Sequence, residues 1–287
     1  IGNICPITLP AMGAIPATGI WTIILLAYAF VAALLPVSWL LQPRDFLNAW
    51  QLYLALGCIL AGIVTLAING NPLAMHAPAI NTNPIGAPSL WPFLFITLAC
   101  GAISGFHSLI CSGTTAKQIN NECDAQLVGY GSMISEGFLA VLMLVAVCAG
   151  LGLAYEQADG SMLQGLAAWQ SHYGSWQASA GLGSKLAAIV TGCANFMAVI
   201  GIPKSLAMSI VGVLIASFAG TTLDSATRVQ RYIITELCQS NQKLKHWISP
   251  IKSTSIAVIS AAILAFSSGL NGRGALALWP MFGAVNQ

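Results

Sequence analysis

Three ionisable side chains lie inside apolar stretches of this sequence, where a charge is costly. They are His107, Glu136 and Asp224, and each belongs to a run long enough to cross a lipid bilayer. Ionisable residues at such positions are functional candidates, because they line substrate paths or relay protons. The chemistry that they offer is the binding of a proton, a small cation or a carboxylate.

Asp224 has the most informative neighbours. Helical spacings of three and four place four polar side chains on one side of a helix: Thr221, Asp224, Ser225 and Arg228. Together with Thr222 they supply hydroxyl and carboxylate oxygens, which suit a small cation or a proton. The alternative is a plain ion pair between Asp224 and Arg228 at a helix end. The hydroxyls favour a coupling-ion site, because an ion pair does not need them.

The stretch Cys100-Gly-Ala-Ile-Ser-Gly-Phe-His-Ser108 concentrates small and polar residues inside an apolar run. Its GxxxG spacing ordinarily indicates close packing of helices. Combined with His107 it favours a broken membrane helix, because unpaired backbone is tolerated only against protein or a water-filled cavity. His107 could bind the carboxylate of a substrate. The alternative is a hydrogen bond from His107 to a neighbouring helix. We expect substrate contacts from five residues: Gly101, Ser104, Gly105, His107 and Ser108.

Glu136 and two basic residues are further candidates. Glu136 lies about one turn into an apolar run and suits a proton relay. A pair with an interfacial Lys, or a hydrogen bond to a neighbouring helix, fits Glu136 equally well. Lys117 lies in the polar connection 112–124, where most charges are simply solvated. The functional alternative is a gate to which Lys117 and Arg228 contribute.

Composition defines the class of protein. Hydrophobic residues make up 57% of the 287 residues and charged residues 6%, whereas soluble domains average about 25% charged. Several apolar runs of 18 residues or more predict an all-α polytopic membrane protein in contact with membrane lipid. The net charge of +2 is too small to indicate nucleic-acid binding.

Several kinds of site are disfavoured by what the sequence lacks. The eight cysteines show no CxxC and no metal-ligand spacing, so we expect neither a disulfide framework nor a metal site. Walker A, GxGxxG, HExxH and nucleophile-elbow motifs are also missing, which argues against an ATP-driven pump or a membrane hydrolase. We expect no enzyme and no cofactor beyond a coupling H⁺ or Na⁺. The chain starts at Ile1 without Met, and we expect a fragment of a longer protein.

Apolar runs predict about six spans within a single transmembrane domain of residues 1–287: 18–41, 46–68, 92–112, 130–154, 205–238 and 250–268. A polar turn at 42–48 separates the first two, and a polar loop at 155–183 follows the fourth. If the less apolar run 184–202 does not cross, seven of the ten Lys and Arg share one side; if it crosses, the split is four against six. The positive-inside rule favours the first solution. We therefore predict an extracytoplasmic segment at 155–204 that contains a re-entrant or surface helix.

Longer motifs occur in order along nearly the whole chain. They read LLPVSWLLQPRD (34–45), CGAISGFHSLI (100–110), SGTTAK (112–117), NECDA (121–125), VGYGSM (128–133), TLDSATR (222–228) and WPMFGAVNQ (279–287). Together they resemble the carbon starvation protein A family. The resemblance implies a bacterial inner-membrane, multi-pass secondary transporter of the amino acid–polyamine–organocation superfamily, whose members take up peptides, or pyruvate with protons, during the cellular response to starvation.

The resemblance also implies a LeuT-like inverted-repeat fold, in which two discontinuous helices meet at the membrane midplane. In that frame 92–112 resembles the broken first helix of the second repeat. Residues 184–202 resemble the extracellular re-entrant element, and 205–238 resemble the helix that supplies cation ligands. The other broken helix would lie in the missing part of the longer protein.

The leading hypothesis is a proton- or cation-coupled importer of peptides or small carboxylates that works by alternating access. A membrane-embedded nutrient sensor, which binds the same ligands without moving them, is the alternative. A haem-carrying subunit would need paired histidines on facing spans, and only His107 lies within a span. The sequence leaves the substrate, the coupling ion and the oligomeric state open.

Overall fold

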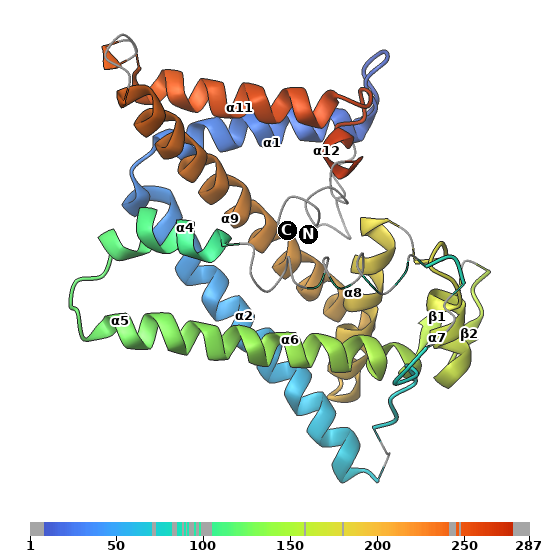
Figure 1. The fold of residues 1–287 in the computed structure, drawn as a ribbon. Coiled ribbons are helices and arrows are strands. Elements are labelled where there is room, and N and C mark those ends of the chain that lie inside the picture. The colour runs from blue at the N-terminus through green and yellow to red at the C-terminus, as the bar shows by residue number, and fades with distance from the viewer. Residues whose placement is uncertain are drawn as a thin grey trace. The chain divides into compact units, whose positions relative to one another are not determined.

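The structure is a computed structural model, and it is almost entirely helical (Figure 1). It describes residues 9–70, 73–81, 85–87, 89, 91, 95, 98, 105–157, 159–179, 181–240, 245–246 and 248–277. The chain forms two compact units, which are described separately. Unit 1 comprises residues 1–43, 89–118 and 220–287, and unit 2 comprises residues 44–88 and 119–219. Helices α2 and α9 contribute residues to both.

The first two helices meet at Pro36. Helix α1 is Ala17–Leu34 and α2 is Val37–Ile68. Leu35 between them is extended (φ −67°, ψ 151°), because the ring of a following proline disfavours helical backbone in the preceding residue. The predicted polar turn at 42–48 is therefore wrong. Pro43 lies inside α2, a position that membrane helices tolerate when neighbouring groups satisfy the freed carbonyl.

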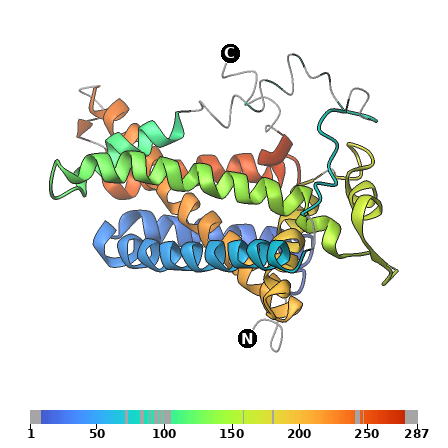
Figure 2. The same cartoon turned by 90° about the horizontal axis from the view of Figure 1, so that it is seen from below.

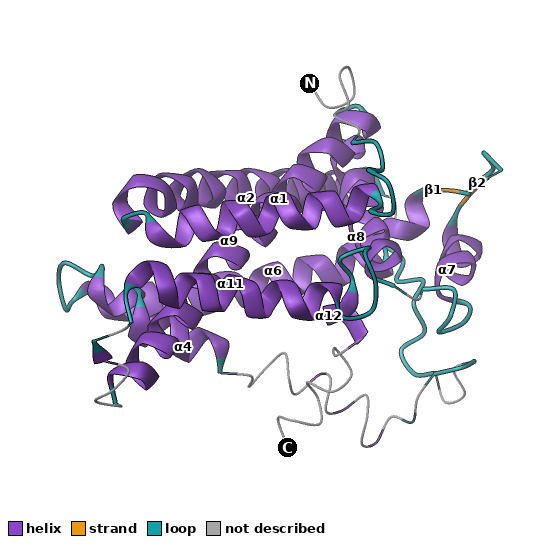
Figure 3. Ribbon diagram, turned by 90° about the horizontal axis from the view of Figure 1, so that it is seen from above, coloured by secondary structure: helices purple, strands orange, loops and turns teal. Residues whose placement is uncertain are grey.

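In unit 1, α1 runs side by side with α11 (Pro250–Phe266), as Figures 1 and 3 both show. The residues that these two helices bury are small, which lets helix backbones approach closely. A Cβ atom on Gly19 of α1 would collide with the main-chain oxygen of Leu270, so only glycine fits there. Pro250 opens α11 at a position where its missing N–H costs nothing. The short helix α12 (Gly274–Ala277) follows.

Helix α9 (Lys204–Gln239) is continuous over 36 residues. This confirms the helix predicted from the run 205–238 and its polar extension. Within unit 1 it hydrogen-bonds to α11 through Gln230 Nε2 to Ser260 Oγ (3.1 Å) and Thr235 Oγ1 to Ser253 Oγ (3.1 Å). Polar side chains bridging membrane helices in this way add about 0.6 kcal/mol each on average.

In unit 2, a long helical segment replaces the predicted span 130–154. It begins earlier, with α5 (Asp124–Gln126), passes through a π-helical turn (Leu127–Gly131) and continues as α6 (Ser132–Cys148). Figure 2 shows these pieces as one continuous rod. A 3₁₀ turn, Gly150–Leu153, closes the segment.

The core of unit 2 forms where α6 packs against α8 (Leu182–Val199). A Cβ atom on Gly192 would collide with the main-chain oxygen of Ala146, and one on Gly62 with that of Phe196. Buried Asn195 donates from Nδ2 to the carbonyl oxygens of Gly150 (2.8 Å) and Ala154 (2.7 Å). Small residues and one paired amide therefore hold these helices at close range.

The predicted loop 155–183 contains regular secondary structure, so that expectation was incomplete. Strands β1 (Tyr155–Glu156) and β2 (Met162–Leu163) form a small antiparallel hairpin, and α7 (Gly165–Tyr173) follows it (Figure 3). At the turn, Gly160 adopts φ +81°, which glycine accepts without strain. The side chain of Asp159 accepts hydrogen bonds from the backbone N and the hydroxyl of Ser161 (2.9 and 2.6 Å).

Five described helical segments are long and apolar enough to cross a membrane: 17–34, 37–68, 124–153, 182–199 and 204–239. Helix α11, with 17 residues, is a shorter apolar helix. The predicted all-α membrane class is thus confirmed. Helix α8 has a length and composition compatible with crossing, so the predicted re-entrant placement of 184–202 stays a prediction.

Candidate functional site

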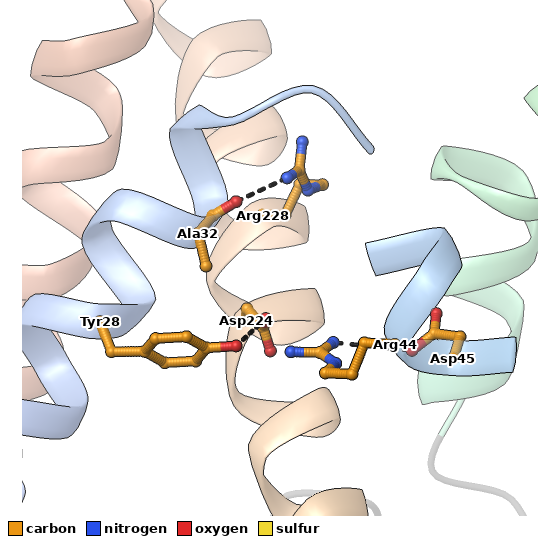
Figure 4. Close-up of polar contacts among 6 residues, drawn as sticks. All are labelled: Tyr28, Ala32, Arg44, Asp45, Asp224 and Arg228. Carbon is orange, nitrogen blue, oxygen red and sulfur yellow. Dashed lines mark hydrogen bonds and ion pairs between the residues drawn. The ribbon is translucent and has the colours of Figure 1, made fainter. Parts of the chain in front are cut away.

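The candidate site is centred on Asp224, in the part of α9 that belongs to unit 1. The Asp224 side chain is completely buried. The hydroxyl of Tyr28, on α1, donates a hydrogen bond to Asp224 Oδ2 at 3.1 Å (Figure 4). Burying a carboxylate is costly unless it is hydrogen-bonded, paired or neutralised. An acidic side chain held at such a point in a membrane helix is therefore a candidate functional group.

One turn further along α9, Arg228 is directed to the carboxyl end of α1. Its Nη2 atom donates to the carbonyl oxygens of Ala32 (2.7 Å) and Leu35 (2.8 Å) (Figure 4). Arg231 adds a third bond, from Nη1 to the carbonyl oxygen of Ala33 (2.7 Å). The last carbonyls of a helix lack partners within it and carry partial negative charge. Two guanidinium groups from α9 thus cap α1.

This geometry decides one alternative left open by the sequence. In the described part of the chain, Arg228 and Asp224 form no ion pair, and the guanidinium of Arg228 hydrogen-bonds to α1 instead. The plain ion-pair interpretation was therefore wrong. The reason is that Arg228, only 3% exposed, donates to two carbonyl oxygens at the end of α1, and helical spacing along α9 does not show which other helix lies beside it.

The predicted hydroxyl ligands flank Asp224 on α9. Thr221 and Ser225 are half-buried, whereas Thr222 is exposed. The assignment of these three residues to a coupling-ion site stays a prediction. Among the described residues no group of three His, Cys, Asp or Glu side chains is arranged to hold a metal ion.

The structure describes only part of the predicted broken helix. Gly101 and Ser104 lie outside the described residues. Gly105 has φ +79° and immediately precedes α4 (Phe106–Gly113), so no regular helix runs through it. His107 and Ser108 lie on the exposed side of the first turn of α4. Their contact with substrate stays a prediction.

The predicted gate residue Lys117 lies in a 3₁₀ turn, Thr115–Lys117, after α4. Its ammonium group lies 5.5 Å from the centre of the Tyr232 ring, and the Arg231 guanidinium lies 4.7 Å from the same ring. These are cation–π contacts, which link the connection after α4 to α9 within unit 1. Glu136, in unit 2, is exposed on α6. The gate and relay roles are untested.

Sequence reasoning missed Tyr28, Arg231 and the carbonyls at the end of α1. Tyr28 is one aromatic residue in an apolar run, and nothing in the run marks it as a partner of Asp224. The signal that was available is the spacing of Arg228 and Arg231, which places two cations on one side of α9. Another polar pair, Arg44 with Asp45 in unit 2, is an ion pair of chain neighbours at 3.6 Å (Figure 4).

The apolar helices and the buried carboxylate among them define a polytopic α-helical membrane protein, which in bacteria resides in the inner membrane. The chain belongs to the family described as "Carbon starvation protein CstA", which matches residues 14–287. This confirms the family resemblance predicted from the sequence motifs.

Individual relatives carry more specific names. The chain is 33% identical over 297 residues to "Peptide transporter CstA" of Helicobacter pylori (strain J99), which covers 92% of this chain and 42% of the relative. It is 49% identical over 128 residues to "Pyruvate/proton symporter BtsT" of Escherichia coli (strain K12), covering 44% of this chain and 18% of the relative. No solved structure matches the chain. The chain thus spans about two fifths of the full-length curated relatives it matches.

Proposed function

We propose that the chain is part of a secondary active transporter that imports peptides or small carboxylates such as pyruvate, coupled to H⁺ or Na⁺. The observation that carries the proposal is the completely buried Asp224, hydrogen-bonded at 3.1 Å by Tyr28 from another apolar helix. A carboxylate at such a position can exchange a proton or a small cation with water as the protein changes conformation. The names of the relatives, peptide transporter and pyruvate/proton symporter, support this substrate class.

The coupling mechanism follows from what joins α1 to α9. Asp224 shares a hydrogen bond with Tyr28, while Arg228 and Arg231 bind the end of α1. Protonation of Asp224, or binding of Na⁺ to it, changes the charge that the Tyr28 hydroxyl faces. Charge-assisted hydrogen bonds are about twice as strong as neutral ones, so the link between the helices changes with the state of the carboxylate. Ion occupancy at Asp224 would thereby bias how α1 and α9 pack.

The remaining candidates fill the other roles of an alternating-access transporter. Thr221, Thr222 and Ser225 offer oxygen ligands for the ion. Backbone around Gly101–Gly105, with His107 and Ser108, contacts the substrate, and Glu136 relays protons. We infer a LeuT-like inverted-repeat fold for the full-length protein, with the αL glycine at 105 as part of its second broken helix. No step of this mechanism involves enzyme catalysis.

Uptake by the full-length protein in proteoliposomes tests the proposal. Radiolabelled pyruvate and alanyl-alanine are compared under an imposed proton gradient, an imposed sodium gradient, and no gradient. Accumulation of either substrate under one gradient supports the proposal. Absence of uptake of both substrates under both gradients contradicts it. Ligand binding without flux in the same preparation favours a nutrient sensor instead.

A further inference from the structure

A cavity of about 340 Å³ lies in unit 2, and all its lining residues belong to that unit. It is formed by the segment after α7, the first turns of α8, the end of α6, and the residues Asn81 and Ile85. The residues that give it chemical character are Asn81, Tyr173, Ser175, Trp176, Ser179 and Lys185. Ligand pockets in proteins span about 300–1,000 Å³, so this cavity has the size for a small metabolite.

The walls of the cavity are held in place by local contacts. The backbone N–H of Trp176 donates to the carbonyl oxygen of Ile85 at 2.9 Å, which ties the two connecting segments together. Tyr173 stacks on Trp169 with a centroid distance of 4.4 Å and an interplanar angle of 29°. The Ser179 hydroxyl, nearly buried, donates to the carbonyl oxygen of Trp176. Ser179 is buried and Tyr173 half-buried, whereas Trp176 and Lys185 are exposed at the mouth of the cavity.

Lys185 supplies the positive charge of the cavity. Its ammonium group lies 5.8 Å from the centre of the Trp176 ring, which is a cation–π contact between two exposed side chains of the lining. No described carboxylate lies within ion-pair distance of Lys185. Lys185 also lies in the first turn of α8, where the helix dipole favours negative charge. The positive charge and the helix end together favour an anionic group as the occupant.

We propose that this cavity binds a small organic carboxylate, with Lys185 holding the carboxylate group and Trp176 and Tyr173 covering its apolar part. Seryl hydroxyls and Asn81 supply hydrogen-bonding groups for further oxygens, such as a keto group or a peptide bond. Tyr173, Trp176 and Lys185 belong to the segment 155–204, which the distribution of Lys and Arg predicts to lie outside the membrane. As an entry site for uptake the pocket rests on the proposed function; as a binding site it can be tested alone.

The test uses full-length protein in detergent, without any gradient, and the tryptophan emission that disappears in Trp176→Phe. Pyruvate is the probe, and methyl pyruvate, which lacks the charge, is its matched control. Alanyl-alanine and alanyl-alaninamide form the corresponding peptide pair. A saturable change in the Trp176 emission is expected with pyruvate. The same change with alanyl-alanine but not with pyruvate would show that the bound carboxylate belongs to a peptide. Methyl pyruvate and alanyl-alaninamide, the two compounds that lack the carboxylate, are expected to bind at least about tenfold more weakly, because a charge-assisted hydrogen bond is lost.

Variants separate this site from general damage. Lys185→Gln is expected to raise the half-saturating pyruvate concentration about tenfold, and Lys185→Arg to restore most of the affinity. Lys204→Gln, at the start of α9, is the matched control and is expected to bind like the wild type. For whichever acid responds, pyruvate or alanyl-alanine, equal binding by Lys185→Gln and wild type, or equal binding of that acid and its counterpart without the carboxylate, would overturn the proposal, as would no response to either acid. Because no flux is measured, failure of transport leaves this result unaffected.

Discussion

The hydroxyl of Tyr28 donates a hydrogen bond to Asp224 Oδ2 at 3.1 Å, joining residues that are 196 positions apart in the chain. It is a direct link between the side chains of α1 and α9, and its acceptor is completely buried. A hydrogen bond to a charged group contributes about 1.5–3 kcal/mol. This link is strong enough for the state of Asp224 to influence the packing of the two helices.

Removing the Tyr28 hydroxyl is expected to weaken coupling. In Tyr28→Phe, gradient-driven uptake by the full-length protein should fall about tenfold or more, as expected from losing about 1.5 kcal/mol or more. Substrate exchange across the membrane without a gradient should be retained. Tyr53→Phe, an exposed tyrosine on α2, is the control and should transport like the wild type. Unchanged gradient-driven uptake in Tyr28→Phe would contradict a role in coupling for the hydrogen bond between Tyr28 and Asp224.

Capping of α1 by two arginines predicts a loss of stability when either is truncated. Arg228→Ala and Arg231→Ala each leave carbonyl oxygens at the end of α1 without their charged donors. The expected cost is about 1–3 kcal/mol each, seen as a lower thermal unfolding temperature in detergent. Arg273→Ala removes an exposed arginine and should change the temperature little. Equal unfolding temperatures for all three variants would contradict the capping role.

Close packing in unit 2 predicts that two glycines cannot be enlarged. In Gly192→Ala and Gly62→Ala the new Cβ atom meets main-chain oxygen, which cannot move aside as a flexible side chain would. Overpacking of this kind costs about 1–3 kcal/mol or more. Gly57→Ala, in α2, meets open space and should be neutral or stabilise the helix by up to about 1 kcal/mol. Thermal unfolding of the three variants side by side distinguishes these outcomes.

His172, on α7 outside the candidate spans, predicts a pH dependence of unit 2. Burial lowers the pKa of His172 below its usual value, against a smaller opposing effect of a hydrogen bond with Ser184. The folded state therefore binds fewer protons than the unfolded one, and stability is lost as pH falls below about 6.5, by at most about 1.4 kcal/mol per pH unit. The groups that face the ring are Tyr155, Tyr173 and Ser184.

Hydrogen exchange checks this dependence. Amide protection across residues 155–184 should decrease between pH 7.5 and 5.5 in the wild type, because charging the buried imidazole disfavours the closed structure. His172→Phe keeps an aromatic ring without a titrating group and should show a flatter response. An equal loss of protection in wild type and variant would assign the pH effect to another group.

Features that depend on neighbouring residues in the chain could be predicted from the sequence, whereas features that depend on contacts between distant segments could not. Apolar length and helical spacing predicted the membrane class and α9, since both are local properties of the chain. The turn predicted at 42–48 was wrong, because a membrane helix tolerates proline at Pro43 when neighbouring groups satisfy the freed carbonyl, and those neighbours are distant in sequence. Helix α7 within 155–183 was also missed, since it packs against the 3₁₀ turn Gly150–Leu153, which helical spacing does not reveal.

The candidate site shows the same limit. Asp224 was recognised because an acidic residue within an apolar run can be seen in the sequence alone. Its partner Tyr28 was not, because a hydrogen bond across 196 positions leaves no pattern in a single sequence. The ion pair expected between Asp224 and Arg228 failed for a related reason. Spacing on a helix shows that two residues are neighbours, but it does not show that carbonyl oxygens at the end of another helix lie within reach of one of them.

The most direct test of the account is gradient-driven uptake by Asp224→Asn in the full-length protein. Asparagine keeps the size and a hydrogen-bond acceptor for Tyr28 but cannot carry the charge that binds a proton or cation. In proteoliposomes, the variant is predicted to exchange labelled substrate between internal and external pools while failing to accumulate it under a proton or sodium gradient. Accumulation by Asp224→Asn equal to that of the wild type would contradict a coupling role for Asp224.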